Sequence, residues 1–255
     1  MTDRVLAVDI GNSSVSVGLF GKGGELRTLR IDTRPIRERA FYEAALREFI
    51  GGDRPAGAVL SSVVPSLDGV FGDVTADLTG SRPVVVSHAV DTGLVFDVAE
   101  PEGIGADRIA NAVAACSTIG GDVVVVDLGS ATTFTVVAGG CRLLGGVIMP
   151  GIGMMCVALE RQTGKLPLVR PAAPAGPLGK DTKSSIISGV VYGTAGAVDR
   201  VLDELSAVLG DFTAVITGGN AALVDALLRR EHLHVPELTL TGLRIIFERN
   251  RGPGR

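Results

Sequence analysis

Two aspartates, each at the end of an apolar run, carry the clearest chemical signal in the sequence. Asp9 follows the run VLAV and Asp127 follows the run VVVV, and after each come an apolar residue, a glycine and a polar residue. A glycine lets the backbone approach an anion closely, and successive backbone N–H groups can hold a phosphate. A carboxylate at the same place can hold Mg²⁺, which prefers oxygen ligands. The pattern therefore predicts phosphate binding assisted by a metal ion.

The two segments repeat one another. In each, a short apolar strand runs into the turn and a second apolar strand follows, over residues 5–19 and 123–137. We expect both segments to be β-hairpins. Because the two aspartates lie about half the chain length apart, the sequence predicts two related halves.

A third apolar run strengthens this interpretation. Residues 214–217 lead directly into Gly218, Gly219 and Asn220. Glycines at a strand end can admit a flat nucleoside. A single Asp-x-Gly turn is common in proteins of every function, whereas two copies and a glycine turn together predict nucleotide binding.

The elements that position these turns alternate between strands and helices. We expect further strands at 56–64, 83–87, 141–148, 214–217 and 238–248, and helices at 37–50, 108–117, 154–162, 184–209 (one or two helices) and 221–230. Helical spacing at 37–50 places four residues on one face: Phe41, Ala45, Leu46 and Phe49. Residues 167–180 are rich in proline and form a loop. Strands that alternate with helices indicate an α/β fold.

Composition excludes several classes of protein. Apolar residues make up 46% of the chain, which excludes a disordered protein. There are 24 Lys+Arg against 28 Asp+Glu, a net charge of −4, which argues against nucleic acid as a partner. The arginine cluster at 27–39 is interpreted as a solvated surface. The longest uncharged run, 143–159, contains Pro150 and several glycines, so we expect a buried segment and no membrane partner.

The cysteines and the N-terminal segment bear on the cellular compartment. Cys116, Cys141 and Cys156 form an odd set without metal-ligand spacing among mostly apolar neighbours. We interpret them as buried thiols rather than as disulfides or zinc ligands. The first residues do not have the pattern of a signal peptide. We therefore expect a cytoplasmic protein.

One further carboxylate has two interpretations. Asp107 stands beside Arg108, directly before an alanine-rich helix. A carboxylate at this place can act as a general base, or it can simply stabilise the helix N-terminus. The three histidines, at positions 88, 232 and 234, share no spacing with a nucleophile and are expected on the surface or in loops.

The arrangement of two phosphate turns and a glycine turn resembles the sugar kinase, Hsp70 and actin superfamily. Several segments are more specifically similar to type III pantothenate kinases: DIGNS at 9–13, SSVVP at 61–65, GADR at 105–108, DLGSA at 127–131, GGVIMPG at 145–151, TGKLP at 163–167, GKDT at 179–182 and LTGLRII at 240–246. They follow the order of that family over nearly the whole chain. The resemblance implies two ribonuclease-H-like domains, at 1–117 and 118–255, with an interdomain cleft.

The resemblance also implies an activity. The family phosphorylates pantothenate with ATP in the first step of coenzyme A synthesis, requires Mg²⁺ and a monovalent cation (K⁺ or NH₄⁺), and forms homodimers. Two alternatives remain open. One is a regulatory relative similar to the Bvg accessory factors, and the other is a kinase of the same superfamily with another small-molecule acceptor.

Residue roles follow from the same resemblance. The residues implied in ATP binding are Asp9, Ile10, Gly11, Asn12, Ser13, Ser14, Val15, Ser16, Ser130, Gly218 and Gly219. Those implied in pantothenate binding are Val98, Gly105, Ala106, Asp107, Arg108 and Thr182. Asp107 is the implied general base, Asp9 the Mg²⁺ ligand and Asp127 the residue near the monovalent cation.

Several positions depart from the family pattern, among them the stretch 33–37, where the family usually has a threonine-rich segment. Val98 stands where a tyrosine often lines the pantothenate pocket, with Phe96 two positions earlier. Ser13 and Ser130 stand where threonine is usual, and both keep a hydroxyl group. The valine at position 98 is the departure that leaves another small-molecule acceptor open.

Overall fold

The computed structural model describes residues 4–52 and 54–251. Its contacts divide the chain into two compact units. Unit 1 holds the chain up to Ile119, together with Cys141–Leu143 and the segment from Leu238 onward. Unit 2 holds Gly120–Gly140 and Leu144–Glu237. The C-terminal segment, which we placed in the second half, thus packs within unit 1.

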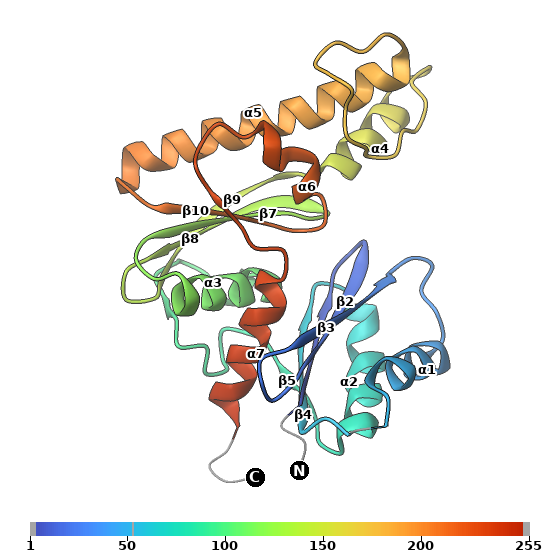
Figure 1. Cartoon of the computed structure of the whole chain (residues 1–255), viewed down its shortest axis with the longest axis vertical. Coiled ribbons are helices and arrows are strands. Elements are labelled where there is room, and N and C mark those ends of the chain that lie inside the picture. Colours follow the sequence, from blue (N-terminus) through green and yellow to red (C-terminus); the bar gives the residue numbers. More distant parts are fainter. Residues whose placement is uncertain (1–3, 53, 252–255) are drawn as a thin grey trace. The chain divides into compact units, whose positions relative to one another are not determined.

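Unit 1 is built on a mixed sheet with the strand order β3-β2-β1-β4-β5 (Figure 1). Its strands are β1 (Val5–Ile10), β2 (Ser14–Phe20), β3 (Leu26–Asp32), β4 (Gly57–Ser62) and β5 (Val84–Val85). Its helices are α1 (Arg39–Ile50), α2 (Pro65–Thr79), η1 (Pro101–Gly103), α3 (Ala106–Thr118) and α7 (Leu238–Asn250). One sheet face packs against α1 and α2, and the other packs against α3 and α7.

The second sheet has the strand order β11-β10-β7-β8-β9-β6, and all of its strands except β6 run in unit 2. The strands of unit 2 are β7 (Val123–Leu128), β8 (Ala131–Ala138), β9 (Arg142–Pro150), β10 (Thr213–Thr217) and β11 (Leu233–His234). The helices of unit 2 are α4 (Ile152–Gln162), α5 (Thr182–Leu209), α6 (Ala221–Val224) and η2 (Asp225–Leu227). The first residues of β9 belong to unit 1, where they pair with β6 (Val95–Phe96).

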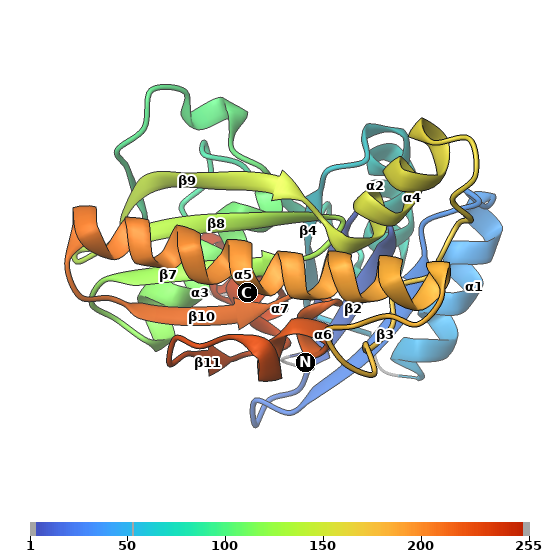
Figure 2. The same ribbon diagram turned by 90° about the horizontal axis from the view of Figure 1, so that it is seen from above.

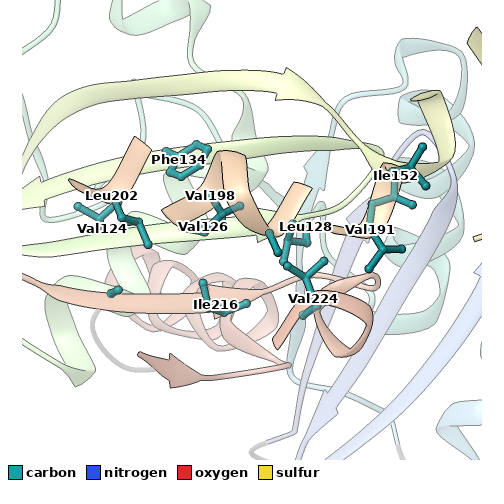
Figure 3. Close-up of a cluster of buried hydrophobic side chains, with 14 of the residues drawn as sticks. Val124, Val126, Leu128, Phe134, Ile152, Val191, Val198, Leu202, Ile216 and Val224 are labelled. Carbon is teal, nitrogen blue, oxygen red and sulfur yellow. The ribbon is translucent and has the colours of Figure 1, made fainter. Parts of the chain in front are cut away.

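The long helix α5 lies along one face of the second sheet (Figure 2). Alternate residues of β7 point toward this helix, because successive side chains of a strand face opposite sides. Figure 3 shows how Val124, Val126 and Leu128 of β7 meet Val191, Val198 and Leu202 of α5. Asp127 therefore lies on the opposite sheet face.

The predicted internal repeat is confirmed at the level of topology. In both sheets the hairpin strands pair antiparallel, and the first hairpin strand has a parallel partner on its other side. That partner is β4 for β1 and β10 for β7. Both hairpins lie where the sequence placed them.

Several local predictions were wrong. The C-terminal segment predicted as a strand is helix α7, because its alternating start, LTLT, gives way to apolar residues at helical spacing. The helix predicted at 221–230 is only α6 and the 3₁₀ turn η2. In α1 the buried residues are Tyr42, Leu46 and Ile50, whereas Phe41 is exposed. Strand β3 and helix α2 were not predicted.

The cysteine prediction was wrong for one pair. The structure joins Cys116, near the end of α3, to Cys141 in a disulfide, with Cα atoms 5.3 Å apart. That separation lies in the range of ordinary disulfides. Beside this pair, the backbone N–H groups of Val95 and Asp97 donate hydrogen bonds of 2.9 Å to the carbonyls of Cys141 and Leu143. Cys156 is a buried free thiol, as predicted.

In residues 4–52 and 54–251, we find no helix with the length and apolar character that crossing a bilayer requires.

Candidate active site

Asp9 lies between two serines on its neighbouring strands. It is directly opposite Ser16 of β2 and Ser61 of β4 in the two strand registers. Cross-strand partners point to the same sheet face. Alternation along β1 places that face with Val5 and Ala7, toward α3 and α7. Asp9 thus offers a carboxylate with two hydroxyls beside it.

Asp127 has the corresponding surroundings in unit 2. It is opposite Thr133 of β8 and Thr217 of β10. The Thr217 hydroxyl, which is almost completely buried, donates a hydrogen bond of 3.3 Å to the carbonyl of Pro236. Each half of the repeat therefore places one aspartate between two hydroxyl side chains, a feature that the sequence pattern alone did not indicate.

These two sets suit hard cations. Each consists only of oxygen atoms, the ligands that Mg²⁺ and other hard cations prefer. The Ser61 hydroxyl is buried without a hydrogen-bond partner among the described residues, so this set has an unused donor and acceptor. Within the described residues no cluster of three or more His, Cys, Asp or Glu side chains could hold a metal ion. A cation at Asp9 would therefore rely on water and phosphate oxygens for most of its ligands, as Mg²⁺ commonly does.

The two turns that follow the aspartates are closed by backbone hydrogen bonds. The N–H of Gly11 donates to the Ser14 carbonyl over 3.0 Å, and the N–H of Gly129 donates to the Ala131 carbonyl over 3.1 Å. Asn12 and Ser13 are exposed, so their backbone can meet a ligand. The side chains of Ile10 and Val15 are fully buried in the core of unit 1, so only their backbone can do so.

The glycine turn packs directly against Asp127. Gly218 has φ +95°, and a Cβ atom there would overlap the Leu128 backbone and the Asp127 carboxylate. Only glycine fits this approach without strain. Asp127, Ser130, Gly218 and Gly219 thus lie at the carboxyl ends of β7 and β10 in unit 2.

Asp107 is the second residue of α3 and is half-buried. Its Oδ1 accepts a hydrogen bond of 2.8 Å from the backbone N–H of Arg108. Burial nevertheless raises the pKa of Asp107, and this effect outweighs the hydrogen bond and the charge of Arg108, which both lower it. Burial also lowers the pKa of Arg108, against the attraction of Asp107. A carboxylate with this raised pKa is a suitable proton acceptor for a hydroxyl group.

The remaining predicted residues occupy two places. Val98 is half-buried just after β6, while the ring of Phe96 contacts that of His88 with centroids 6.5 Å apart. Thr182 is the exposed first residue of α5. The preceding Asp181 caps the helix together with Ser184, and these hydrogen bonds lower the pKa of Asp181. In the described chain no hydrogen bond joins Thr182 to another predicted site residue.

Sequence reasoning missed the side chains that surround the turns. Ser61 and Thr217 interrupt apolar strands opposite the two aspartates, and this interruption was the available signal. Thr33, which donates to the first turn, had no sequence pattern of its own. Asn220 was recognised as the end of the glycine turn, but its contact with the second turn was not predicted.

Comparison with known proteins shows the family to which the chain belongs. The model of the type III pantothenate kinase family matches residues 5–204. The chain belongs to the type III pantothenate kinase family. A type III pantothenate kinase from Anaeromyxobacter sp. strain K is 38% identical over 97% of this chain and 100% of its own length. The type III pantothenate kinase of Moorella thermoacetica is 36% identical over 96% of this chain and 99% of its own length.

Solved structures share the fold with this type III pantothenate kinase family member at low sequence identity. A Baf family protein from Campylobacter jejuni has a TM-score of 0.58 at 20% identity, covering 96% of this chain and 98% of its own. A ROK family glucokinase from Streptomyces griseus has a TM-score of 0.50 at 14% identity, covering 96% and 98%. These likenesses confirm the predicted α/β fold with two related sheets.

Proposed function

We propose that this chain transfers the γ-phosphate of ATP to the primary hydroxyl of pantothenate and forms 4′-phosphopantothenate, the first step toward coenzyme A. The observation that carries the proposal is the half-buried Asp107, which lies in the segment that the family resemblance assigns to pantothenate. Burial raises the pKa of this carboxyl group. Membership of a kinase family adds ATP as the co-substrate.

Phosphoryl transfer to a hydroxyl group requires a proton acceptor and residues that bind the phosphates of ATP. Asp107 accepts the proton of the hydroxyl as its oxygen attacks the γ-phosphate, while Arg108 binds the pantothenate carboxylate. Val98, Gly105, Ala106 and Thr182 complete the pantothenate contacts in this proposal. Specificity between acceptors depends on this group of residues.

In this proposal the backbone of the first turn, residues 9–16, holds the phosphates of ATP. Ser130 makes a further contact with ATP, and Gly218 and Gly219 border its nucleoside. Asp9 would hold Mg²⁺, which neutralises phosphate charge during transfer. Asp127, with the Thr133 and Thr217 hydroxyls beside it, would hold K⁺ or NH₄⁺. Because this activity uses ATP from metabolism, we place the enzyme in the cytoplasm.

The proposal is tested by measuring the product itself. Protein, ATP, Mg²⁺, K⁺ and pantothenate are incubated, and 4′-phosphopantothenate is measured by mass spectrometry for the wild type and for Asp107→Asn. We expect product from the wild type and a loss of about 10²-fold or more in the variant. An exposed aspartate changed in the same way, Asp211→Asn, is the control and keeps full activity.

One observation favours a different acceptor as the second candidate. Val98 stands where the family often has a tyrosine, and the Phe96 ring contacts His88. If ATP binds and no 4′-phosphopantothenate forms, a panel of small alcohols under the same conditions identifies another acceptor. ATP binding without turnover of any acceptor supports a regulatory relative instead.

We also propose a homodimer, on the family resemblance. Light scattering of the active protein at micromolar concentration measures its mass. A mass of one 26.2 kDa chain for active enzyme would contradict this part of the proposal.

A further inference from the structure

Two glycine carbonyls at equivalent places in the repeat are each held by a distant side chain. The Thr33 hydroxyl donates a hydrogen bond of 2.7 Å to the Gly11 carbonyl in unit 1. In unit 2, the Asn220 side-chain amide donates one of 3.1 Å to the Gly129 carbonyl. We propose that Thr33 and Asn220 are positioning residues that orient the backbone N–H groups of the two turns toward the phosphates of ATP. This inference rests on the proposed binding of ATP by these turns.

Thr33 holds the first turn at two carbonyls. Besides the bond from its hydroxyl to Gly11, its backbone N–H donates to the Ser13 carbonyl over 3.1 Å. The Thr33 side chain is completely buried, so water does not compete for the hydroxyl. The carbonyls of Gly11 and Ser13 therefore both point toward Thr33.

Peptide geometry then determines where the N–H groups point. The Gly11 carbonyl and the Asn12 N–H belong to one planar trans peptide and point in opposite directions. The Asn12 N–H thus faces away from Thr33, and within the described residues it meets no protein acceptor. An unpaired, outward N–H on an exposed turn is the group that binds an anion.

Asn220 does the same for the second turn from a different element. Its backbone N–H donates to the Leu128 carbonyl over 2.9 Å, and its side chain holds the Gly129 carbonyl. The Ser130 N–H shares the peptide of the Gly129 carbonyl and so points the opposite way. The close packing of Gly218 on Leu128 sets the position of Asn220 along the turn.

Two different residues, Thr33 and Asn220, make the equivalent hydrogen bond in the two turns. Thr33 follows β3, and Asn220 follows β10, so they are not equivalent positions of the repeat. Gly11 and Gly129 are equivalent, since each is the second residue after its aspartate. The shared feature is thus the orientation of one peptide, which indicates that the orientation itself matters to the turn.

The first test removes the Thr33 hydroxyl at nearly constant shape. Thr33→Val should raise the KM for ATP about 3- to 10-fold, the effect of one hydrogen bond, and leave the KM for pantothenate within about twofold. Thr33→Ser restores the hydroxyl and should restore the KM for ATP. Thr75→Val is the matched control, because Thr75 is also completely buried and its hydroxyl donates to the Phe71 carbonyl within α2.

The second test applies to Asn220. Asn220→Ala should raise the KM for ATP by a similar factor. Asn250→Ala is its control, because the Asn250 amide also donates to backbone carbonyls, those of Asp91 and Ile246, away from either turn. Melting temperatures of all variants show how much of each change comes from lost stability.

Calorimetric titration with a non-hydrolysable ATP analogue measures the same effect without turnover. A wild-type protein that binds the analogue, with Thr33→Val and Asn220→Ala binding it equally well, overturns this inference and leaves the proposed function standing. Equal changes in the KM values for both substrates also overturn it, since they indicate a general structural role. A wild type that does not bind the analogue overturns this inference and the proposed function together.

Discussion

At the scale of single residues, the raised pKa of Asp107 has opposite consequences for activity and stability. Folding brings the carboxylate out of water, and this raises its pKa. The Arg108 N–H, the Arg108 guanidinium and the backbone N–H of Asp107 favour its charged form and offset the effect only in part. A group whose pKa is raised on folding favours the folded state while it is protonated. Its contribution is lost as the pH rises through the folded-state pKa. Ionisation of Asp107 in the folded protein therefore lowers the free energy of unfolding.

This argument predicts two pH dependences. The kcat/KM of the wild type should fall with decreasing pH through an apparent pKa above 3.8, because Asp107 must be ionised to accept a proton. Asp107→Asn, which keeps an acceptor for the Arg108 N–H, should melt at a higher temperature than the wild type at pH 7. That gain should shrink as the pH approaches the ordinary carboxyl range.

Calorimetric melts and rate measurements across this pH range check both expectations. The control Asp211→Asn should show neither effect. A variant Asp107→Asn that melts below the wild type at pH 7 would contradict the assignment of the pKa shift to burial.

At the scale of elements, the pair α3 and α7 supports the proposed pantothenate segment. Gly242 of α7 lies against Ala110 of α3, so closely that a Cβ atom would overlap the Ala110 carbonyl. On the same pair, the Thr239 hydroxyl donates a hydrogen bond of 2.8 Å to the buried Asn111 side chain. The position of α3, which carries Asp107 in its first turn, therefore depends on a helix more than a hundred residues later in the chain.

This contact makes Gly242 sensitive to the smallest substitution. Gly242→Ala should destabilise the protein by about 1–3 kcal/mol, because the helices must move apart. Gly196→Ala in α5 is the control, since a Cβ atom there meets open space and alanine favours a helix by up to about 1 kcal/mol. Denaturant unfolding of the two variants should change in opposite directions. Equal stability of Gly242→Ala and the wild type would show that α3 and α7 pack differently.

The disulfide between Cys116 and Cys141 anchors the other end of α3. It links the helix to the start of β9, which also pairs with β6 just before Val98. Without reductant, denatured protein should therefore show one free thiol, that of Cys156, and reduction should expose all three. Cys141→Ser should lower the unfolding free energy of the oxidised protein by about 2–4 kcal/mol. Three free thiols before reduction would exclude the bond.

At the scale of the whole molecule, the chain leaves unit 1 for unit 2 and returns to it with α7. The return supplies part of a buried cluster, to which α7 contributes four apolar residues: Leu240, Leu243, Ile246 and Phe247. Unit 2 has its own separate core, between α5 and the second sheet. The two units thus differ in their need for the C-terminal segment.

Removal of residues 238–255 tests this organisation. Loss of α7 should expose one face of the first sheet and of α3, so backbone amides of β1, β4 and α3 should exchange with deuterium much faster. Amides of β7, β8 and α5 should keep most of their protection. Hydrogen exchange followed by mass spectrometry measures both groups in one sample. Uniform loss of protection in both units would contradict separate cores.

Much of the site follows from the sequence alone. The two hairpins, the glycine turn and the small-residue helix after Asp107 were all predicted, because strand alternation, glycine turns and helix spacing are local properties of the chain. The same patterns indicated the internal repeat and the α/β fold. The family motifs were also recognised from the sequence alone, and the proposed chemistry follows from them.

Only the tertiary structure decided which side chains meet. Thr33 lies 22 residues from Gly11, and Asn220 lies 91 residues from Gly129, so no local pattern connects them. The serines beside Asp9, the link from Cys116 to Cys141 and the place of α7 depend in the same way on strand order and packing. Local periodicity determines the form of an element, whereas its neighbours are determined by the burial of the whole chain. For α7 that burial produced a helix where the sequence had predicted a strand.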